Sequence, residues 1–135
     1  MDAFDADVLI YAAAPGHPLG TRVRALFETS ASAGIGSALL LPEILSKPLR
    51  DGDQDELSAL AALLGRLELQ PLDEATARLA AALGASYRLD APDAVHLATA
   101  VAAGADRFLT NNRRDFPEGI AEIAITYPDE LPEVG

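Results

Sequence analysis

DAPDAVHLATAVAAGADRFLTNNRRDF, residues 90–116, combines a helix with the short strand that follows it. Pro92 suits the first turn of a helix that extends to about residue 103, and Gly104 ends this helix. Residues 108–110 then form a strand, and polar side chains follow it. In a βαβ unit these positions meet at the carboxyl edge of a parallel sheet, where open α/β proteins bind ligands. A ligand site is therefore predicted at this edge.

The rest of the chain repeats this alternation of short apolar and amphipathic segments. Strands are predicted at residues 3–5, 35–41, 67–72, 108–110 and 123–126. Helices are predicted from residue 8 and at residues 18–30, 43–49, 55–64, 74–85 and 92–103, with one more between the last two strands. This order indicates an α/β fold, a three-layer α/β/α sandwich with a mostly parallel sheet, formed by residues 1–135 as a single domain. Strand order is not readable from the periodicity.

The composition excludes several classes of protein. The chain of 135 residues is half apolar, which is typical of a globular domain and not of a disordered one. Its apolar runs are shorter than the roughly 18 residues that a membrane span needs, so no membrane association is expected. The N-terminus lacks the features of a signal peptide, and the absence of cysteine excludes disulfides and thiolate chemistry. A cytoplasmic location is expected.

The net charge of −11 opposes the binding of nucleic acid at long range. A nucleic-acid partner would have to be met by metal and by local basic side chains. The candidates are Lys47, Arg50, Arg113 and Arg114, which flank acidic residues. Lys47 and Arg50 have an equally good explanation as residues that favour the C-terminal end of a helix.

Several acidic residues follow apolar segments. Asp7 suits the N-cap of the first helix, and Glu43 and Asp93 lie in the first turns of later helices. The helix dipole stabilises an acid there by roughly 0.3–1 kcal/mol, which is a sufficient structural explanation for each one alone. Asp5 differs because it ends a strand, where an unpaired and partly desolvated charge costs several kcal/mol.

A metal would resolve this cost. If Asp5, Glu43, Asp93 and a group from residues 110–115 share one edge of the sheet, their repulsion requires a cation. Hard oxygen ligands without His or Cys select Mg²⁺ or Mn²⁺ over Zn²⁺. Such clusters activate water for in-line displacement at a phosphodiester.

Four sequence blocks resemble those of PIN-domain proteins. They are DADVLIY at residues 5–11, with Ala6 and Asp7 where Thr and Asn are usual, PEIL at 42–45, DAVHLATA at 93–100 and LTNNRRDF at 109–116. The blocks occur in the family's order and extend over nearly the whole chain.

The resemblance implies a function. Small PIN-domain proteins are mostly VapC-like toxins of type II toxin–antitoxin pairs, which are Mg²⁺- or Mn²⁺-dependent endoribonucleases that hydrolyse RNA through metal-activated water. By resemblance, Asp5, Glu43 and Asp93 are metal-binding catalytic carboxylates. The fourth position is either Asn112, which binds metal through its amide oxygen or a water, or Asp115, which completes the acidic set. The resemblance also implies an RNA substrate, a cognate antitoxin that covers the acidic pocket, and a homodimer.

Two further residues have open roles. Thr110 is expected to hydrogen-bond Asp5 or a metal-bound water, or only to end a strand. His96, one turn after Asp93, orients a ligand, contacts RNA, or is a packed residue without a role in the site.

Two alternative functions are considered. A PIN-like domain with an amide at Asn112 could be a catalytically degenerate interaction module. Asp5-x-Asp7 after a strand also resembles the start of a haloacid-dehalogenase-type phosphatase, but Val8 follows where that family has Gly. The chain's one lysine, Lys47, is not in the context which that family requires.

Overall fold

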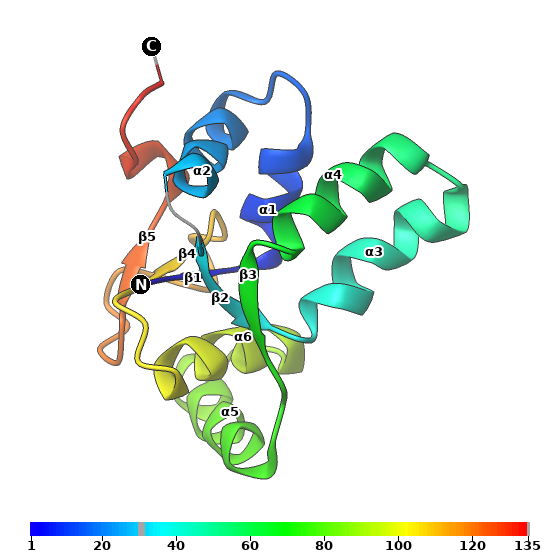
Figure 1. Ribbon diagram of the computed structural model, residues 1–135. Helices are drawn as coiled ribbons and strands as arrows, with labels where there is room; N and C mark the ends of the chain where they lie inside the picture. The colour runs from blue at the N-terminus through cyan, green and yellow to red at the C-terminus, as the bar shows by residue number, and fades with distance from the viewer. Residues whose placement is uncertain (30–31, 135) are drawn as a thin grey trace.

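The computed structural model describes residues 1–29 and 32–134, and these contain a parallel sheet of five strands (Figure 1). The strands are β1 (Asp2–Phe4), β2 (Gly34–Ser37), β3 (Leu67–Gln70), β4 (Arg107–Leu109) and β5 (Ala124–Thr126). The helices are α1 (Ala6–Ala13), α2 (Pro18–Glu28), α3 (Leu40–Asp51), α4 (Gln54–Leu64), α5 (Glu74–Tyr87) and α6 (Ala91–Ala102), with a 3₁₀ helix, η1 (Pro128–Glu130).

The sheet separates two helical layers, as Figure 1 shows. Phe4 and Leu109 pack with α1 to α4 on one face, whereas Ala3 and Phe108 pack with α5 and α6 on the other. Successive side chains of a strand point to opposite faces, so β1 and β4 each contribute to both cores. The predicted three-layer α/β/α fold is confirmed, and every strand pair is parallel.

The strand order β3-β2-β1-β4-β5 places the first strand in the centre of the sheet. From β1 the chain continues outward through β2 to β3, and it later returns to the other side of β1 as β4. The sheet therefore reverses its winding direction between β1 and β4, which is where open α/β proteins bind ligands. Phe4 pairs with Leu109, and the Asp5 amide donates to the Leu109 carbonyl at 2.9 Å. Asp5 and Thr110 consequently lie side by side at the carboxyl edge.

Two helices begin earlier than the sequence predicts. Asp5, not Asp7, is the N-cap of α1: its backbone is extended (φ −81°, ψ 164°) and its carboxylate accepts from the Ala6 amide. The chain therefore enters the helix directly after the strand, and Asp7 lies in the first turn. Similarly, β2 ends at Ser37 and α3 begins at Leu40, so the strand predicted over residues 35–41 is too long. The predicted end of α2 at Ser30 lies outside the described residues.

The helix predicted between the last two strands is wrong. Residues 111–123 form consecutive turns instead. Pro117 and Gly119 interrupt any helix here. Phe116 and Ile120 are buried against the α5–α6 side of the sheet, so the turns still contribute to the core.

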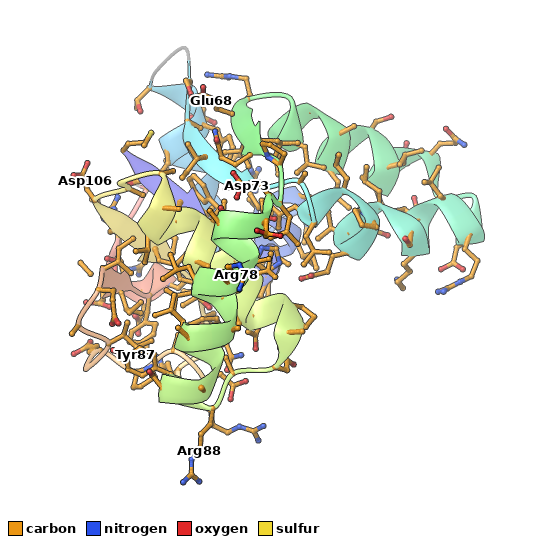
Figure 2. The ribbon with its side chains drawn as sticks, turned by 90° about the horizontal axis from the view of Figure 1, so that it is seen from below. Glu68, Asp73, Arg78, Tyr87, Arg88 and Asp106 are labelled. Carbon is orange, nitrogen blue, oxygen red and sulfur yellow. The ribbon has the colours of Figure 1, made fainter. Side chains whose placement is uncertain are left out.

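The two helical layers differ in shape. In Figures 1 and 2, α3 and α4 form a hairpin that extends sideways beyond the sheet. Figure 2 looks onto α5, which ends where Arg88 adopts a left-handed conformation (φ 57°) and points away from the body. Among the described helices, none has both the length and the apolar character needed to cross a bilayer.

Candidate metal centre

Asp5 is the innermost acid of the carboxyl edge, with only 5% of its surface exposed. Its Oδ1 accepts from the Ala6 amide and its Oδ2 from the Thr110 hydroxyl, both at 2.8 Å. Burial raises the pKa of the Asp5 carboxyl, although the nearby His96, the Thr110 hydroxyl and the Ala6 amide oppose this rise. The structure therefore fixes this carboxylate firmly but leaves its charge only partly compensated.

Glu43 and His96 approach Asp5 from opposite faces of the sheet, on α3 and α6. The Glu43 Oε2 atom lies 3.0 Å from the His96 Nε2 atom. One ligand atom from each of these three residues lies within 4.8 Å of the other two. Asp5 and Glu43 thus converge as the sequence predicts. His96 lies beside them, a neighbour that the oxygen-only ligand set expected from the sequence does not include.

Asp93 lies outside the trio but within its electric field. Burial raises the pKa of the Asp93 carboxyl to about 7, and the charges of Asp5, Asp90 and Asp115 add to the rise, while His96 opposes it. The Asp93 amide donates to the Asp90 carboxylate at 3.0 Å, which caps the start of α6. Asp93 therefore lies close enough to Asp5 and to Asp115 for the charges of both to affect its pKa.

The fourth sequence block folds into a hydrogen-bonded turn. Asn112 donates from Nδ2 to the Asp115 Oδ2 atom at 2.9 Å and accepts from the Asp115 amide at 3.2 Å. The Asn112 amide in turn donates to the Thr110 hydroxyl at 3.1 Å. The side-chain oxygen of Asn112 is thus already bonded, and its side chain fixes that of Asp115.

Asp7 is a half-buried acid whose environment the sequence did not indicate. Its Oδ2 accepts from the Asn111 amide at 3.0 Å, and its buried Oδ1 has no partner among the residues that the structure describes. Burial, together with the charge of Asp5, raises the pKa of the Asp7 carboxyl to about 7. The one available signal was Asp7 standing where PIN-domain proteins usually have Asn.

The four basic candidates do not form a separate cluster of free cations. Three of them pair with carboxylates: Arg50 with Asp51, Arg113 with Asp129, and Arg114 with Asp115. The Arg113 guanidinium also lies over the Tyr127 ring, 4.0 Å from its centre. Lys47 is exposed and forms no ion pair within residues 1–29 and 32–134.

The donors of this edge fit a divalent cation. Carboxylate oxygens are the ligands that Mg²⁺ and Mn²⁺ prefer, and an imidazole nitrogen is tolerated by Mn²⁺. Burial raises the pKa values of the Asp5 and Asp93 carboxyls, and neighbouring acids add to the rise. A bound cation would favour the charged form of both. The edge is therefore a candidate divalent metal centre.

The fold and the site together define a class of protein, in which a parallel α/β sheet carries an acidic centre at its switch point. A family model described as PIN domain matches residues 3–121. The chain therefore belongs to the PIN domain family, and the haloacid-dehalogenase alternative is wrong. No curated protein sequence matches the chain.

Solved structures share this fold. A toxin–antitoxin complex from Klebsiella pneumoniae contains a chain that is 24% identical, with a TM-score of 0.76 over 99% of this chain and 100% of that one. VapBC2 from Rickettsia felis, bound to a DNA fragment from its promoter, is 18% identical, with a TM-score of 0.71 over 93% and 97%. FitAB bound to an IR36 DNA fragment is 21% identical, with a TM-score of 0.70 over the full length of both chains.

Proposed function

We propose that this chain is a divalent-metal-dependent endoribonuclease and the toxin of a type II toxin–antitoxin pair. The observation that carries the proposal is the convergence of Asp5 and Glu43 at the switch point of a PIN fold, with Asp93 in the same electric field. The similar structures support the toxin role, because they are toxin–antitoxin complexes. The substrate is RNA.

Each residue of the centre has a separate task in this proposal. Asp5, Glu43 and Asp93 hold Mg²⁺ or Mn²⁺, and Asp115 completes the acidic set. Such a cation, when bound, activates water and neutralises phosphate charge. Thr110 fixes the Asp5 carboxylate through its hydroxyl. The side-chain oxygen of Asn112 accepts a hydrogen bond from the Asp115 backbone amide. This favours Asp115 over Asn112 as the fourth residue of the metal site.

An RNA strand must approach a protein of net charge −11. In this proposal, Lys47, Arg50, Arg113 and Arg114 provide the local positive charge. Arg114 is the most available of the three candidate arginines, because 92% of its side chain is exposed and its nitrogen lies 3.7 Å from the Asp115 carboxylate. Arg113 is less available while it is held by Asp129 and Tyr127.

The partner in this proposal is a cognate antitoxin. A groove of about 520 Å³ lies between α1 and α4. Ile10 and Ala59 contribute apolar lining, and Asp53, Asp55 and Glu56 contribute acidic groups. A helix with apolar and basic side chains has the complementary chemistry. Homodimerisation is also proposed, and light scattering of the purified protein measures it.

Cleavage of total RNA in the presence of Mn²⁺ tests the activity. Asp5→Asn should reduce cleavage by at least about 100-fold, because changes even in groups that only support a metal ligand cost about 10–100-fold. Glu68→Gln is the matched control, since it also removes one negative charge but lies on the edge strand β3 (Figure 2). Equal cleavage by wild type and Asp5→Asn would overturn the proposal.

A catalytically degenerate interaction module is the second candidate function. Both polar atoms of the Asn112 side chain are hydrogen-bonded to Asp115. This favours an interaction module, because an amide bonded in this way contributes little to a metal site. Calorimetric titration with Mn²⁺ distinguishes the two functions. A nuclease should show a binding site that Asp5→Ala removes, and an interaction module should show none.

A further inference from the structure

His96 is a buried histidine whose role in the centre follows from its two ring nitrogens. Only 2% of its surface is exposed, which leaves little area for contact with RNA. Its Nε2 atom lies 3.0 Å from the Glu43 Oε2 atom. This separation suits a hydrogen bond, but it equally suits two neighbouring ligands of one octahedral ion with bonds of about 2.1 Å. The distance alone does not distinguish the two arrangements.

The Nδ1 atom of His96 distinguishes the hydrogen bond from the pair of metal ligands. A histidine that binds metal through one nitrogen almost always donates the proton on its other nitrogen to an acceptor. The His96 Nδ1 atom is buried and has no hydrogen-bond partner among the residues that the structure describes. A buried N–H without an acceptor is costly, so the proton belongs on Nε2, where Glu43 accepts it.

We propose that His96 is a positioning residue, which donates from Nε2 to Glu43 Oε2 and leaves Glu43 Oε1 to bind the metal. The inference rests on the proposed function for its metal, but the hydrogen bond itself can be tested without one. His96 thereby acts through Glu43 and does not itself bind the cation.

Glu43 needs this support more than Asp5 does. Asp5 is fixed by the Ala6 amide and the Thr110 hydroxyl, at the end of a central strand. Glu43 has a longer side chain, 32% exposed, and His96 is the one hydrogen-bond partner of its carboxylate among the described residues. The two residues also join α3 to α6 across the edge of the sheet. Without His96, the Glu43 carboxylate would rotate into solvent and weaken the centre.

Nitrogen-15 NMR of the metal-free protein tests the hydrogen bond directly. The chain has only two histidines, so His17→Asn assigns the spectrum, and Asn can replace His17 as the N-cap of α2. We expect His96 to carry its proton on Nε2. We also expect the nitrogen-15 resonance of this Nε2 atom to shift when Glu43 is changed to Gln. A proton on Nδ1 alone would overturn the proposal, whatever the protein does to RNA.

Mn²⁺ affinity tests the positioning role. His96→Leu should weaken binding about 10–100-fold, whereas His96→Gln, whose amide can donate from a similar place, should stay within a few-fold of wild type. His17→Gln is the matched control. An electron-spin-echo signal from a nitrogen bound to Mn²⁺ would overturn the proposal by showing His96 as a ligand. Wild-type affinity in His96→Leu would also overturn it. Absence of Mn²⁺ binding by the wild type would overturn the proposed function and the positioning role together, and the NMR result would then show whether the hydrogen bond exists.

Discussion

Thr110 is fully buried, and its hydroxyl connects the first and fourth sequence blocks. It donates to the Asp5 carboxylate and accepts from the Asn112 amide. Thr110→Val keeps the shape but removes both bonds and leaves buried polar groups unpaired. We expect the free energy of unfolding to fall by about 1–3 kcal/mol, measured by urea denaturation of the metal-free protein.

Thr99→Val is the control for this change. Thr99 is also buried, but its hydroxyl donates only to the Val95 carbonyl within α6, which keeps its helical partner. Thr99→Val should lower the free energy of unfolding less than Thr110→Val does. Equal losses in the two variants would mean that the Thr110 hydroxyl has no special role in the centre.

Asp7 predicts a pH dependence of stability. The pKa of its carboxyl is raised from 3.8 to about 7 by burial and by Asp5, so the folded protein holds this proton more tightly than the unfolded chain does. The contribution of Asp7 to stability is therefore greatest below a pH of about 4, and it is lost as the pH rises to about 7. Asp7→Asn should flatten this fall, which amounts to a few kcal/mol at most, in urea denaturation from pH 5 to pH 8 with chelator present.

Asp73→Asn is the control for Asp7→Asn. Hydrogen bonds from Thr76 lower the pKa of the exposed Asp73 carboxyl, so its contribution is lost only as the pH falls below its ordinary value of 3.8. This variant should keep the wild-type slope between pH 5 and pH 8. A wild-type slope in Asp7→Asn as well would show that Asp7 does not titrate in this range.

The sequence indicates some site residues much better than others. Asp5 and Glu43 are predictable because each follows an apolar segment, and parallel strands bring such ends to one edge. The contact of His96 with Glu43 joins positions 53 residues apart, and no spacing within either helix predicts it. The sequence allows either Asp5 or Asp7 to cap the first helix. The environment of Asp7 depends on which of the two does so, and the sequence does not decide this.

At the level of elements, Gly20 allows α1 and α2 to cross closely. A Cβ atom at this position would lie 1.9 Å from the Tyr11 carbonyl oxygen, which is backbone and cannot rotate away. Gly20→Ala should therefore lower the free energy of unfolding by about 1–3 kcal/mol, despite the higher helix propensity of alanine. The displaced α1 carries Asp7 and is capped by Asp5, so Mn²⁺ affinity should fall too.

Gly119→Ala is the matched control for Gly20→Ala. A Cβ atom there would meet no atom within 4 Å, and the backbone does not need a positive φ. Its denaturation midpoint should stay close to that of wild type. A neutral Gly20→Ala would mean that the two helices can separate at little cost.

The order of helices and strands was predictable because hydrophobic periodicity reports it, but boundaries and turns were not. The start of α1 depended on whether Asp5 or Asp7 capped it, and both are good caps. Residues 111–123 contain buried apolar residues at spacings that resemble a helix, but Pro117 and Gly119 interrupt a helix there and the segment packs as turns. Strand order required contacts between distant segments, which periodicity does not contain.

For the whole molecule, the net charge of −11 predicts that divalent metal stabilises the fold. A cation that binds only the folded state at 100 times its dissociation constant adds about 2.7 kcal/mol. Mn²⁺ should therefore raise the melting temperature more than NaCl of equal ionic strength does, and Asp5→Asn should lose the difference. Equal effects of the two salts would indicate general screening in place of a site.

The position of β1 in the centre of the sheet has a consequence during translation. Within this sheet β1 is synthesised first, and it pairs with β4, whose Arg107 is the partner of Asp2, so one of its neighbours is made about 105 residues later. At about 5–20 residues per second, this delay is roughly 5–20 s. Asp5 meets Thr110 only after that interval. A nascent chain therefore carries no assembled acidic centre until the segment around Thr110 has been made.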